Sequence, residues 1–312
     1  MVDPHVALAG LLVGFVMGMT GMGGGALMTP VLVLIFGVEP LAAVSSDIVA
    51  SMIMKPVGGA VHWGRGTVHR GLVLWLVIGS VPAAFLGVLV LKLLGTGAAM
   101  QESIRLALGV ALLTVAAGLT IRPLLRGRSS TPDAPVESGT PIVVRRLPTV
   151  LAGAAGGLLV GIASVGSGSL IIVLLLLLYP RIRLSELVGT DLVQACPLIA
   201  SAALGHLLFG DFRLPLTASI LVGSLPGVYL GARFSSRAPD HVIRPALTIV
   251  LTASALKLLG VSTGVVGLVG GALILIAFAH AFIRWQRERS TASVTTAATS
   301  SKLQPWSEAI DD

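Results

Sequence analysis

Charged residues are scarce in this chain, and aromatic residues and cysteines are scarcer still. Only 11% of the 312 residues are charged and 4% are aromatic, and the single cysteine, Cys196, lies in an apolar segment. One cysteine cannot form an internal disulfide and offers no metal-binding framework, so we interpret it as a packing residue. A soluble domain carries about twice this fraction of charge, and the composition therefore excludes an ordinary soluble fold.

Long apolar runs are what the chain has in abundance. Hydrophobic residues make up 54% of the sequence, and the mean hydropathy is +0.95. A helix needs about 20 apolar residues to cross the hydrocarbon core of a bilayer, and runs of this length recur along the chain. The run at 72–91 has no alternation of apolar and polar residues, which argues against barrel strands. The sequence predicts an all-α polytopic membrane protein.

The apolar segments fall into two groups separated by a polar stretch rich in proline, glycine, serine and threonine. We expect the segments at 6–20, 26–37, 41–62, 71–92 and 103–121, and then at 148–165, 169–179, 184–208, 214–234, 242–260 and 263–283. This organisation predicts a first transmembrane repeat at 1–121, a cytoplasmic linker at 122–147, a second transmembrane repeat at 148–260, an additional transmembrane helix at 261–284 and a cytoplasmic tail at 285–312. Two short segments, 26–37 and 169–179, follow glycine-rich turns and either cross the membrane or re-enter it.

The basic residues lie in short segments beside the apolar runs. The formal net charge is +7, and this placement indicates membrane topology and no nucleic-acid partner. With the linker in the cytoplasm, the Lys and Arg residues outside the cell are Lys92, Arg105, Arg213 and Lys257, and Lys55 lies within a span. The positive-inside rule then predicts an external N-terminus and a cytoplasmic C-terminus in the cell inner membrane. No Lys or Arg precedes Lys55, so we expect no cleaved signal peptide.

An internal repeat relates the two halves of the chain. Gly10-Leu-Leu-Val-Gly14 recurs as Gly157-Leu-Leu-Val-Gly161, and four further matches share an offset of 144 residues. Those matches pair Asp47 with Asp191, His62 with His206, Gly66 with Gly210, and Gly79-Ser-Val-Pro82 with Gly223-Ser-Leu-Pro226. An odd number of crossings separates the copies, so the sequence predicts two inverted-topology repeats. Each would hold a glycine-rich broken helix or re-entrant hairpin and about three transmembrane helices, with a central site near the midplane.

A glycine cluster occurs at the same place in each half. The first contains Gly21, Gly23, Gly24 and Gly25, and the second contains Gly166, Ser167 and Gly168. Backbone N–H groups at the start of a helix attract negative charge, so these clusters are candidates for binding an anion. The alternative is helix packing or a tight turn, because glycine is common in membrane helices.

Two acidic residues interrupt apolar segments. Asp47 follows Ser45 and Ser46, and Asp191 follows Thr190. An intramembrane carboxylate costs about 2.5 to 3.5 kcal/mol on insertion scales, so each needs a reason to be there. One reason is a proton or cation coupling site, or a carboxylate that orients groups around a substrate. The other is an N-cap at the start of a helix near the membrane edge.

Two histidines, His62 and His206, each follow the corresponding aspartate by 15 residues. On a straight helix this spacing is about 60° around the axis, so each histidine shares a broad face with its aspartate. Titration near neutral pH suits a proton relay, but both lie near segment ends, where an interfacial histidine is ordinary. Both interpretations remain open.

Lys55 is the strongest single candidate, and it has no counterpart because Ile199 occupies its place in the second half. A cation inside a span, near glycines able to bind an anion, suits the neutralisation of an oxyanion. The alternative is an internal ion pair with Asp47. The sequence offers no nucleotide-binding loop, metal-ligand cluster, catalytic Ser-His-Asp constellation or cofactor motif, so we expect no enzyme and transport driven by a gradient.

Taken together, these motifs resemble the TauE/SafE family of sulfite exporters and anion permeases. The matching stretches are Gly21-Met-Gly-Gly-Gly25, Ala42-Ala-Val-Ser-Ser-Asp47, Lys55-Pro-Val-Gly-Gly, His62-Trp-Gly-Arg-Gly, Gly79-Ser-Val-Pro-Ala, Val188-Gly-Thr-Asp191, Gly205-His206, Gly223-Ser-Leu-Pro-Gly227 and Gly231. The resemblance implies a helical carrier that moves sulfite, sulfonates or related anions, usually outward. This chain departs from the family pattern at Gly166-Ser-Gly-Ser, where a fuller glycine run is expected.

The leading hypothesis is a secondary transporter for a small oxyanion. Its expected substrate residues are the two glycine clusters, Ser45, Ser46, Lys55 and Thr190, while Asp47, Asp191, His62 and His206 tune charge or coupling. Its partners would be the anion, membrane lipid and protons. One alternative is a transporter-like receptor or assembly partner, and a membrane enzyme is a third option with no catalytic constellation to support it.

Overall fold

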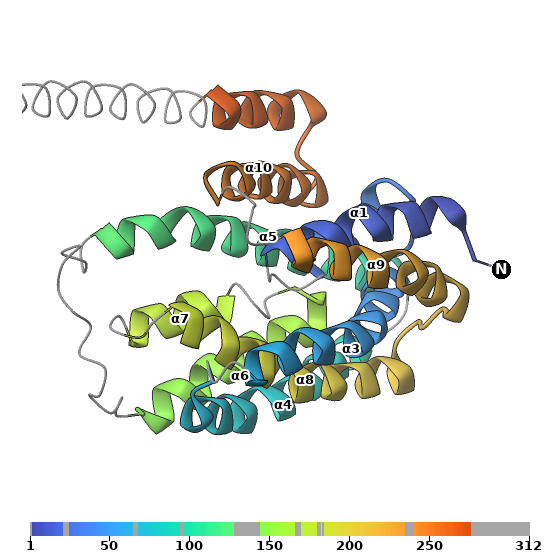
Figure 1. The fold of residues 1–312 in the computed structure, drawn as a ribbon. Helices are drawn as coiled ribbons and strands as arrows, with labels where there is room; N and C mark the ends of the chain where they lie inside the picture. Colours follow the sequence, from blue (N-terminus) through green and yellow to red (C-terminus); the bar gives the residue numbers. More distant parts are fainter. Residues whose placement is uncertain are drawn as a thin grey trace, which may run out of the picture. The chain divides into compact units, whose positions relative to one another are not determined.

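The computed structural model describes residues 2–20, 25–64, 68–93, 97–127, 144–165, 170–179, 182, 184–234 and 240–275. These residues form helices and connecting turns, with no strand among them (Figure 1). The helices are α1 (Pro4–Thr20), α2 (Gly25–Leu34), α3 (Pro40–Gly64), α4 (Arg70–Leu93), α5 (Ala98–Gly127), α6 (Arg146–Ala163), α7 (Leu170–Leu178), α8 (Leu184–Phe209), α9 (Leu214–Phe234) and α10 (Asp240–Leu258), and a short apolar helix follows at Thr263–Leu275. Residues Met1–Val266 form one compact unit, and Gly267–Asp312 form a second, of which the structure describes 267–275.

The predicted apolar segments correspond one to one with these helices. Both short segments are helical, as α2 and α7. The largest difference is α5, which continues to Gly127, past the end expected at residue 121 and into the expected linker. Arg122 and Arg126 end the apolar pattern of this segment, but they do not end α5, because a helix can continue in water after it leaves the hydrocarbon.

Two pairs of helices cross closely along rows of glycines, and these pairs are α1 with α9 and α4 with α6. On α9, Gly223, Gly227 and Gly231 face the backbone of Ala7, Leu11 and Phe15 in α1. On α6, Gly153, Gly157 and Gly161 face the backbone of Leu76, Ser80 and Ala84 in α4. A Cβ atom at any of these glycines would collide with the opposite backbone. Small residues at every fourth position allow this approach, which is common between membrane helices.

The interior is formed where α3 packs against α8, with α4 also lying along α8. Helix α5 packs against α10, and the short helices α2 and α7 lie against α3 and α6 respectively. The most deeply buried apolar side chains come from all of these helices and include Leu32, Ile48, Leu76, Leu112, Ile171 and Leu198. Helices α3 and α8 and both short helices therefore surround one interior region.

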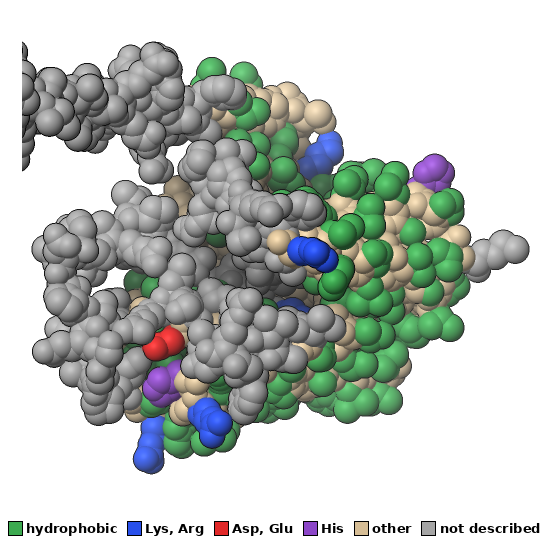
Figure 2. Space-filling view, in the orientation of Figure 1, with side chains coloured by type: hydrophobic (Ala, Val, Ile, Leu, Met, Phe, Trp, Pro, Cys, Tyr) green, Lys and Arg blue, Asp and Glu red, His purple; other side chains and the backbone are tan. Residues whose placement is uncertain are grey.

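Many large apolar side chains remain exposed, which is expected of a surface that faces lipid. They include Leu12, Leu74, Leu86, Leu207, Val222 and Tyr229. Figure 2 shows hydrophobic side chains covering much of the described surface on the right of the view. Within the described residues, five helices are long and apolar enough to cross a membrane, at Arg70–Leu93, Ala98–Thr120, Arg146–Ala163, Gly189–Phe209 and Leu214–Gly231. The chain is a multi-pass membrane protein.

Candidate functional site

Asp47 lies in the interior on α3, seven residues after the helix begins, and its side chain has no exposed surface. Its Oδ2 atom accepts hydrogen bonds from the Ser164 hydroxyl, at 2.7 Å, and from the Thr29 hydroxyl, at 3.1 Å. Its Oδ1 atom is buried without a hydrogen-bond partner among the described residues. The N-cap interpretation is wrong for Asp47, because the residue lies well inside a helix.

The two donors to Asp47 come from the broken regions of both halves. Thr29 lies one turn into α2, which follows the first glycine cluster, and Ser164 follows the last residue of α6, just before the second cluster. Ser164 has a left-handed backbone, with φ of 55°, and its N–H bonds to the Val160 carbonyl. A Cβ on Gly25 would come within 2.6 Å of the Ser164 side chain, so the start of α2 touches the end of α6.

Most of the predicted glycine-cluster residues lie outside the described residues. These are Gly21, Gly23, Gly24, Gly166, Ser167 and Gly168. Gly25 is described and buried at the first position of α2. Gly25 is the last residue of the first cluster, and Ser164 lies two residues before the second. The structure places these two residues in contact.

Asp191 lies at the corresponding place on α8 and has a different set of partners. It is 1% exposed, and its Oδ1 atom accepts a hydrogen bond from the Gln194 side-chain amide at 3.1 Å. The Gln194 carbonyl oxygen in turn accepts one from the Ser80 hydroxyl at 3.2 Å. Because Asp191 is also seven residues into its helix, the N-cap interpretation is wrong here too.

Lys55 is buried on α3, two turns beyond Asp47. The carboxylates that act on its ammonium are Asp191 on the facing helix and Asp47 on its own helix. One cation inside the membrane region thus acts on carboxylates from both halves.

His206 links three helices from a fully buried position on α8. Its Nε2 atom lies 2.8 Å from the Gly161 carbonyl oxygen at the end of α6, and its Nδ1 atom lies 2.9 Å from the Ser45 hydroxyl on α3. A carbonyl only accepts, so Nε2 carries a proton, and in the neutral ring Ser45 donates to Nδ1. Although His206 lies three residues before the end of α8, its side chain is buried in the protein. The side chain of His62 lies outside the described residues.

Ser46 and Thr190 make matching contacts across the two halves. The Ser46 hydroxyl accepts the Arg213 backbone N–H at 3.4 Å, and the Thr190 hydroxyl accepts the His69 backbone N–H at 3.0 Å. Arg213 directly precedes α9, and His69 directly precedes α4. These two residues are separated by 144 positions, as are Ser46 and Thr190. Each hydroxyl therefore ties the start of a helix from the other half to the interior.

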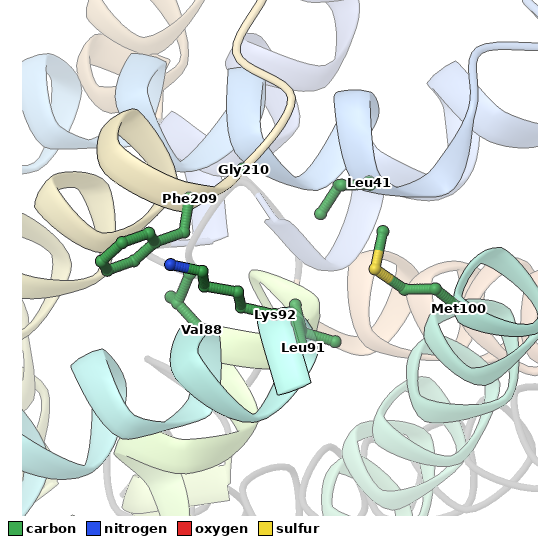
Figure 3. Close-up of a pocket in the computed structure, with 7 residues that line it drawn as sticks. All are labelled: Leu41, Val88, Leu91, Lys92, Met100, Phe209 and Gly210. Atoms are coloured by element: carbon green, nitrogen blue, oxygen red, sulfur yellow. The ribbon is translucent and has the colours of Figure 1, made fainter. Parts of the chain in front are cut away.

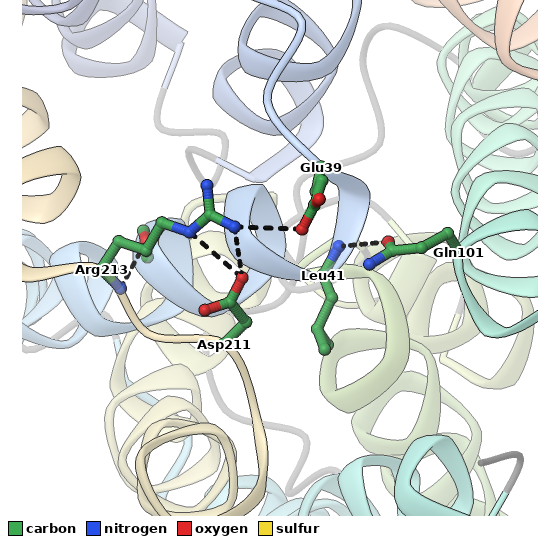
Figure 4. A network of polar contacts seen from close by, with 6 residues as sticks. Glu39, Leu41, Gln101, Asp211 and Arg213 are labelled. Atoms are coloured by element: carbon green, nitrogen blue, oxygen red, sulfur yellow. Dashed lines mark hydrogen bonds and ion pairs between the residues drawn. The ribbon is translucent and has the colours of Figure 1, made fainter. Parts of the chain in front are cut away.

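A cluster of charged residues lies at the ends of the helices near Arg213. Its guanidinium donates to Asp211 at 2.7 Å and to Glu39 at 3.0 Å, and nearby the Leu41 N–H bonds to the Gln101 side chain (Figure 4). The hydrogen bond to Asp211 raises the pKa of Arg213 further above its usual value, so the cation keeps its charge. The ion pair joins the loop before α3 to the loop before α9.

A pocket of about 230 Å³ lies close to these helix ends and is separate from the predicted substrate residues. Its lining residues are Leu41, Val88, Leu91, Lys92, Met100, Phe209 and Gly210. Figure 3 shows the Lys92 side chain extending toward Phe209, and its Nζ atom lies 4.1 Å from the ring centroid. The one charge in the pocket is therefore already engaged by an aromatic face.

Sequence reasoning missed four polar residues of the interior, namely Thr29, Ser80, Ser164 and Gln194. Each is buried and hydrogen-bonded to Asp47, to Asp191 or to a partner of Asp191. A signal was present, because a hydroxyl or amide inside an apolar segment needs a partner. Within the described residues, no group of three His, Cys, Asp or Glu side chains is placed to hold a metal ion.

Comparison with known proteins gives a family and several relatives. The family model described as sulfite exporter TauE/SafE matches residues 6–258. The "Probable membrane transporter protein YjnA" of Bacillus subtilis is 36% identical over 255 residues, which are 81% of this chain and 98% of the relative. The "Probable membrane transporter protein YdhB" of the same organism is 25% identical over 81% of this chain and 99% of its own length. A "Probable membrane transporter protein" of Xylella fastidiosa is 27% identical over 80% of this chain and 91% of its own length. No solved structure matches the chain.

Proposed function

The chain belongs to the sulfite exporter TauE/SafE family and is a membrane transporter, and from this premise we propose that it carries a small sulfur-containing oxyanion, such as sulfite or an organosulfonate, out of the cell. The sulfur-containing class comes from the family description. The proposed driving force is a proton gradient, since intramembrane carboxylates are common in proton-driven carriers.

One observation carries the proposed central site, which is the pair of hydrogen bonds from Thr29 and Ser164 to Asp47. These bonds bring together α2, α3 and the end of α6, so that the residues flanking both glycine clusters meet beside a buried carboxylate. Broken helices that meet at such a point are where carriers bind solutes and ions. We therefore assign the anion to the backbone of Gly21, Gly23–Gly25 and Gly166–Gly168.

Lys55 is the proposed counter-charge for the anion. It is buried within a helix that passes beside this junction, and Asp191 on the facing helix acts on its ammonium group. An oxyanion that reaches the junction would draw the ammonium away from Asp191. Ile199, its counterpart, supplies no charge, so the substrate site is asymmetric.

The hydroxyls of Ser45, Ser46 and Thr190 are proposed to shape the site. Ser45 bonds to His206, while Ser46 and Thr190 accept backbone N–H groups before α9 and α4. Their hydrogen bonds are used to hold helices in place, so we assign them positioning roles and leave direct contact with the anion to the glycine backbone and Lys55.

The two halves are proposed to be inverted-topology repeats. In support, α1 with α9 and α6 with α4 form the same glycine-lined crossing, and α3 pairs with α8 as α5 pairs with α10. The exchanged bonds of Ser46 and Thr190 obey the same two-fold relation. With the cytoplasmic linker that the arginines favour, the N-terminus lies outside the inner membrane and the C-terminus lies in the cytoplasm.

Flux into proteoliposomes tests the proposed function. Purified protein is reconstituted, and uptake of labelled sulfite and of labelled taurine is measured with and without a pH gradient. Saturable, protein-dependent flux of either anion supports the proposal, and no saturable flux of any sulfur oxyanion rejects it. Lys55→Met should abolish flux at unchanged protein abundance, whereas Lys92→Met, a change at a lysine outside the site, should not.

The same variants separate a carrier from a receptor or assembly partner. If Lys55→Met leaves flux unchanged and alters only the recovery of associated proteins from the membrane, the chain acts through recruitment. Reporter fusions at both termini test the orientation, since a cytoplasmic N-terminus would contradict it.

A further inference from the structure

The two aspartates at matching positions on α3 and α8 are held by different chemistry. Asp47 receives only hydroxyl donors, from Thr29 and Ser164, and its Oδ1 atom has no partner among the described residues. Asp191 receives a hydrogen bond from the side-chain amide of Gln194 on its own helix, and its charge also acts on Lys55. Lys55 therefore acts on both carboxylates, but the hydrogen-bond donors differ: two hydroxyls bond to Asp47, and a side-chain amide bonds to Asp191.

Hydroxyl partners suit a carboxyl group that changes protonation state. A serine or threonine hydroxyl donates to a carboxylate and, after rotation about its C–O bond, accepts from a carboxylic acid. An amide N–H or an ammonium only donates, so it suits a carboxylate that stays charged. By this criterion Asp47 can gain and lose a proton without losing its two hydroxyl neighbours, whereas the amide of Gln194 favours the charged form of Asp191.

We propose that the carboxyl group of Asp47 carries the coupling proton of the transport cycle. This inference rests on the proposed function and names its coupling residue. The step is a simple proton transfer between water at one membrane face and the carboxylate, with no other bond formed or broken. Asp191 keeps its charge throughout the cycle as the partner of Lys55.

The neighbours of Asp47 give its protonation a structural consequence. Thr29 lies one turn from the start of α2, and Ser164 lies at the end of α6 in a left-handed conformation. Protonation weakens both hydroxyl bonds to Oδ2 together, because a neutral oxygen is a poorer acceptor than a charged one. The hold of Asp47 on α2, through Thr29, and on the end of α6, through Ser164, therefore weakens on both sides at once.

Few titratable groups face Asp47 from the helices packed around α3. The buried ones among the described residues are Lys55 on α3 itself and Asp191 and His206 on α8, with Cys196 half-buried on α8. Helix α2 carries none, and the charged or titratable side chains described on α5 and α9 are Glu102, Arg105, Tyr229 and Arg233, none of which is buried. Both ring nitrogens of His206 are already in hydrogen bonds, so it is a positioning residue here.

The test compares Asp47→Asn with Asp191→Asn in proteoliposomes that contain the full chain and labelled sulfite. Asparagine keeps the shape and the acceptor oxygen of aspartate but binds no proton. We expect Asp47→Asn to lose accumulation driven by a pH gradient, down to the level of protein-free liposomes, while exchange of internal for external sulfite continues. Asp191→Asn should still respond to the pH gradient but with weaker affinity for sulfite.

Three results overturn the proposal. The first is accumulation by Asp47→Asn that matches the wild type under a pH gradient. The second is wild-type accumulation that follows a sodium gradient and ignores pH, and the third is a loss of the pH response in Asp191→Asn but not in Asp47→Asn. A total absence of sulfite flux in the wild type contradicts the proposed function instead.

Infrared difference spectroscopy keeps the proposal testable even if no flux is found. A pH titration of the reconstituted wild-type protein should give the carbonyl band of a protonated carboxyl group. Asp47→Asn should remove that band, and Asp191→Asn should leave it in place. A band that persists in Asp47→Asn would refute the assignment independently of any substrate.

Discussion

Replacing Gly157 by alanine should destabilise the protein, although the same change usually stabilises a helix. The new Cβ would lie 2.7 Å from the Ser80 Cα atom on α4, whereas ordinary contacts are 3.4–4 Å. The helices would have to separate by roughly 1 Å, and overpacking of this kind costs about 1–3 kcal/mol. Alanine returns about 1 kcal/mol of helix propensity. The net expectation is a loss of up to about 2 kcal/mol of unfolding free energy.

Denaturant titration in detergent micelles measures this loss, and substitutions at two other glycines serve as controls. Gly264 has nothing within 4 Å of a built Cβ, so Gly264→Ala should gain up to about 1 kcal/mol. At Gly10 the nearest atom is the Ile220 carbonyl oxygen at 2.9 Å, so Gly10→Ala should cost less than Gly157→Ala. If Gly157→Ala stabilises the protein as Gly264→Ala does, the crossing of α4 and α6 is not as close as we describe.

Three further changes test individual contacts. His206→Gln should lower the unfolding free energy by about 1 kcal/mol, because one amide cannot replace both ring nitrogens. The pH profile of flux should keep its shape, and a changed profile would make His206 a proton carrier. Arg213→Gln should cost less than about 1 kcal/mol and less still at high salt, since its ion pair with Glu39 is exposed; a salt-independent loss would contradict this. Tyr179→Phe should lower the unfolding free energy by about 1–3 kcal/mol, because the buried Tyr179 hydroxyl bonds to Thr149 at 2.7 Å and accepts the Arg145 backbone N–H. An unchanged unfolding free energy would show that water takes the place of this hydroxyl.

The helices were predictable from the sequence because hydrocarbon leaves the backbone no other way to satisfy its polar groups. Apolar runs of the right length, such as 71–92 and 214–234, match α4 and α9 to within a residue or two. The end of α5 was not predictable in this way. The run from Arg122 to Gly127 contains two arginines and a proline, and such residues mark where an apolar span ends but not where its helix ends.

The residues of the candidate site were predictable one at a time, but their partners were not. An aspartate in an apolar segment is conspicuous, so Asp47 and Asp191 could be found without a structure. Their hydroxyl and amide partners are ordinary residues that become informative only through contact. Ser164 is separated from Asp47 by 117 residues, and its left-handed backbone follows from the break after α6, which no residue preference indicates.

Ser80 and Ser224 occupy the same place in the two halves, and their environments predict opposite effects of the same substitution. Ser80 donates to Gln194, so Ser80→Ala leaves a buried amide oxygen without its donor and should cost about 1–3 kcal/mol of unfolding free energy. The residue matching Gln194 in the first half is Ala50, and the buried Ser224 hydroxyl has no partner among the described residues. Ser224→Ala should therefore be neutral or stabilising in the same denaturant titration, because it removes an unsatisfied polar group. Equal losses for the two variants would mean that the halves remain symmetric in the interior, and the division of roles between Asp47 and Asp191 would lose its structural basis.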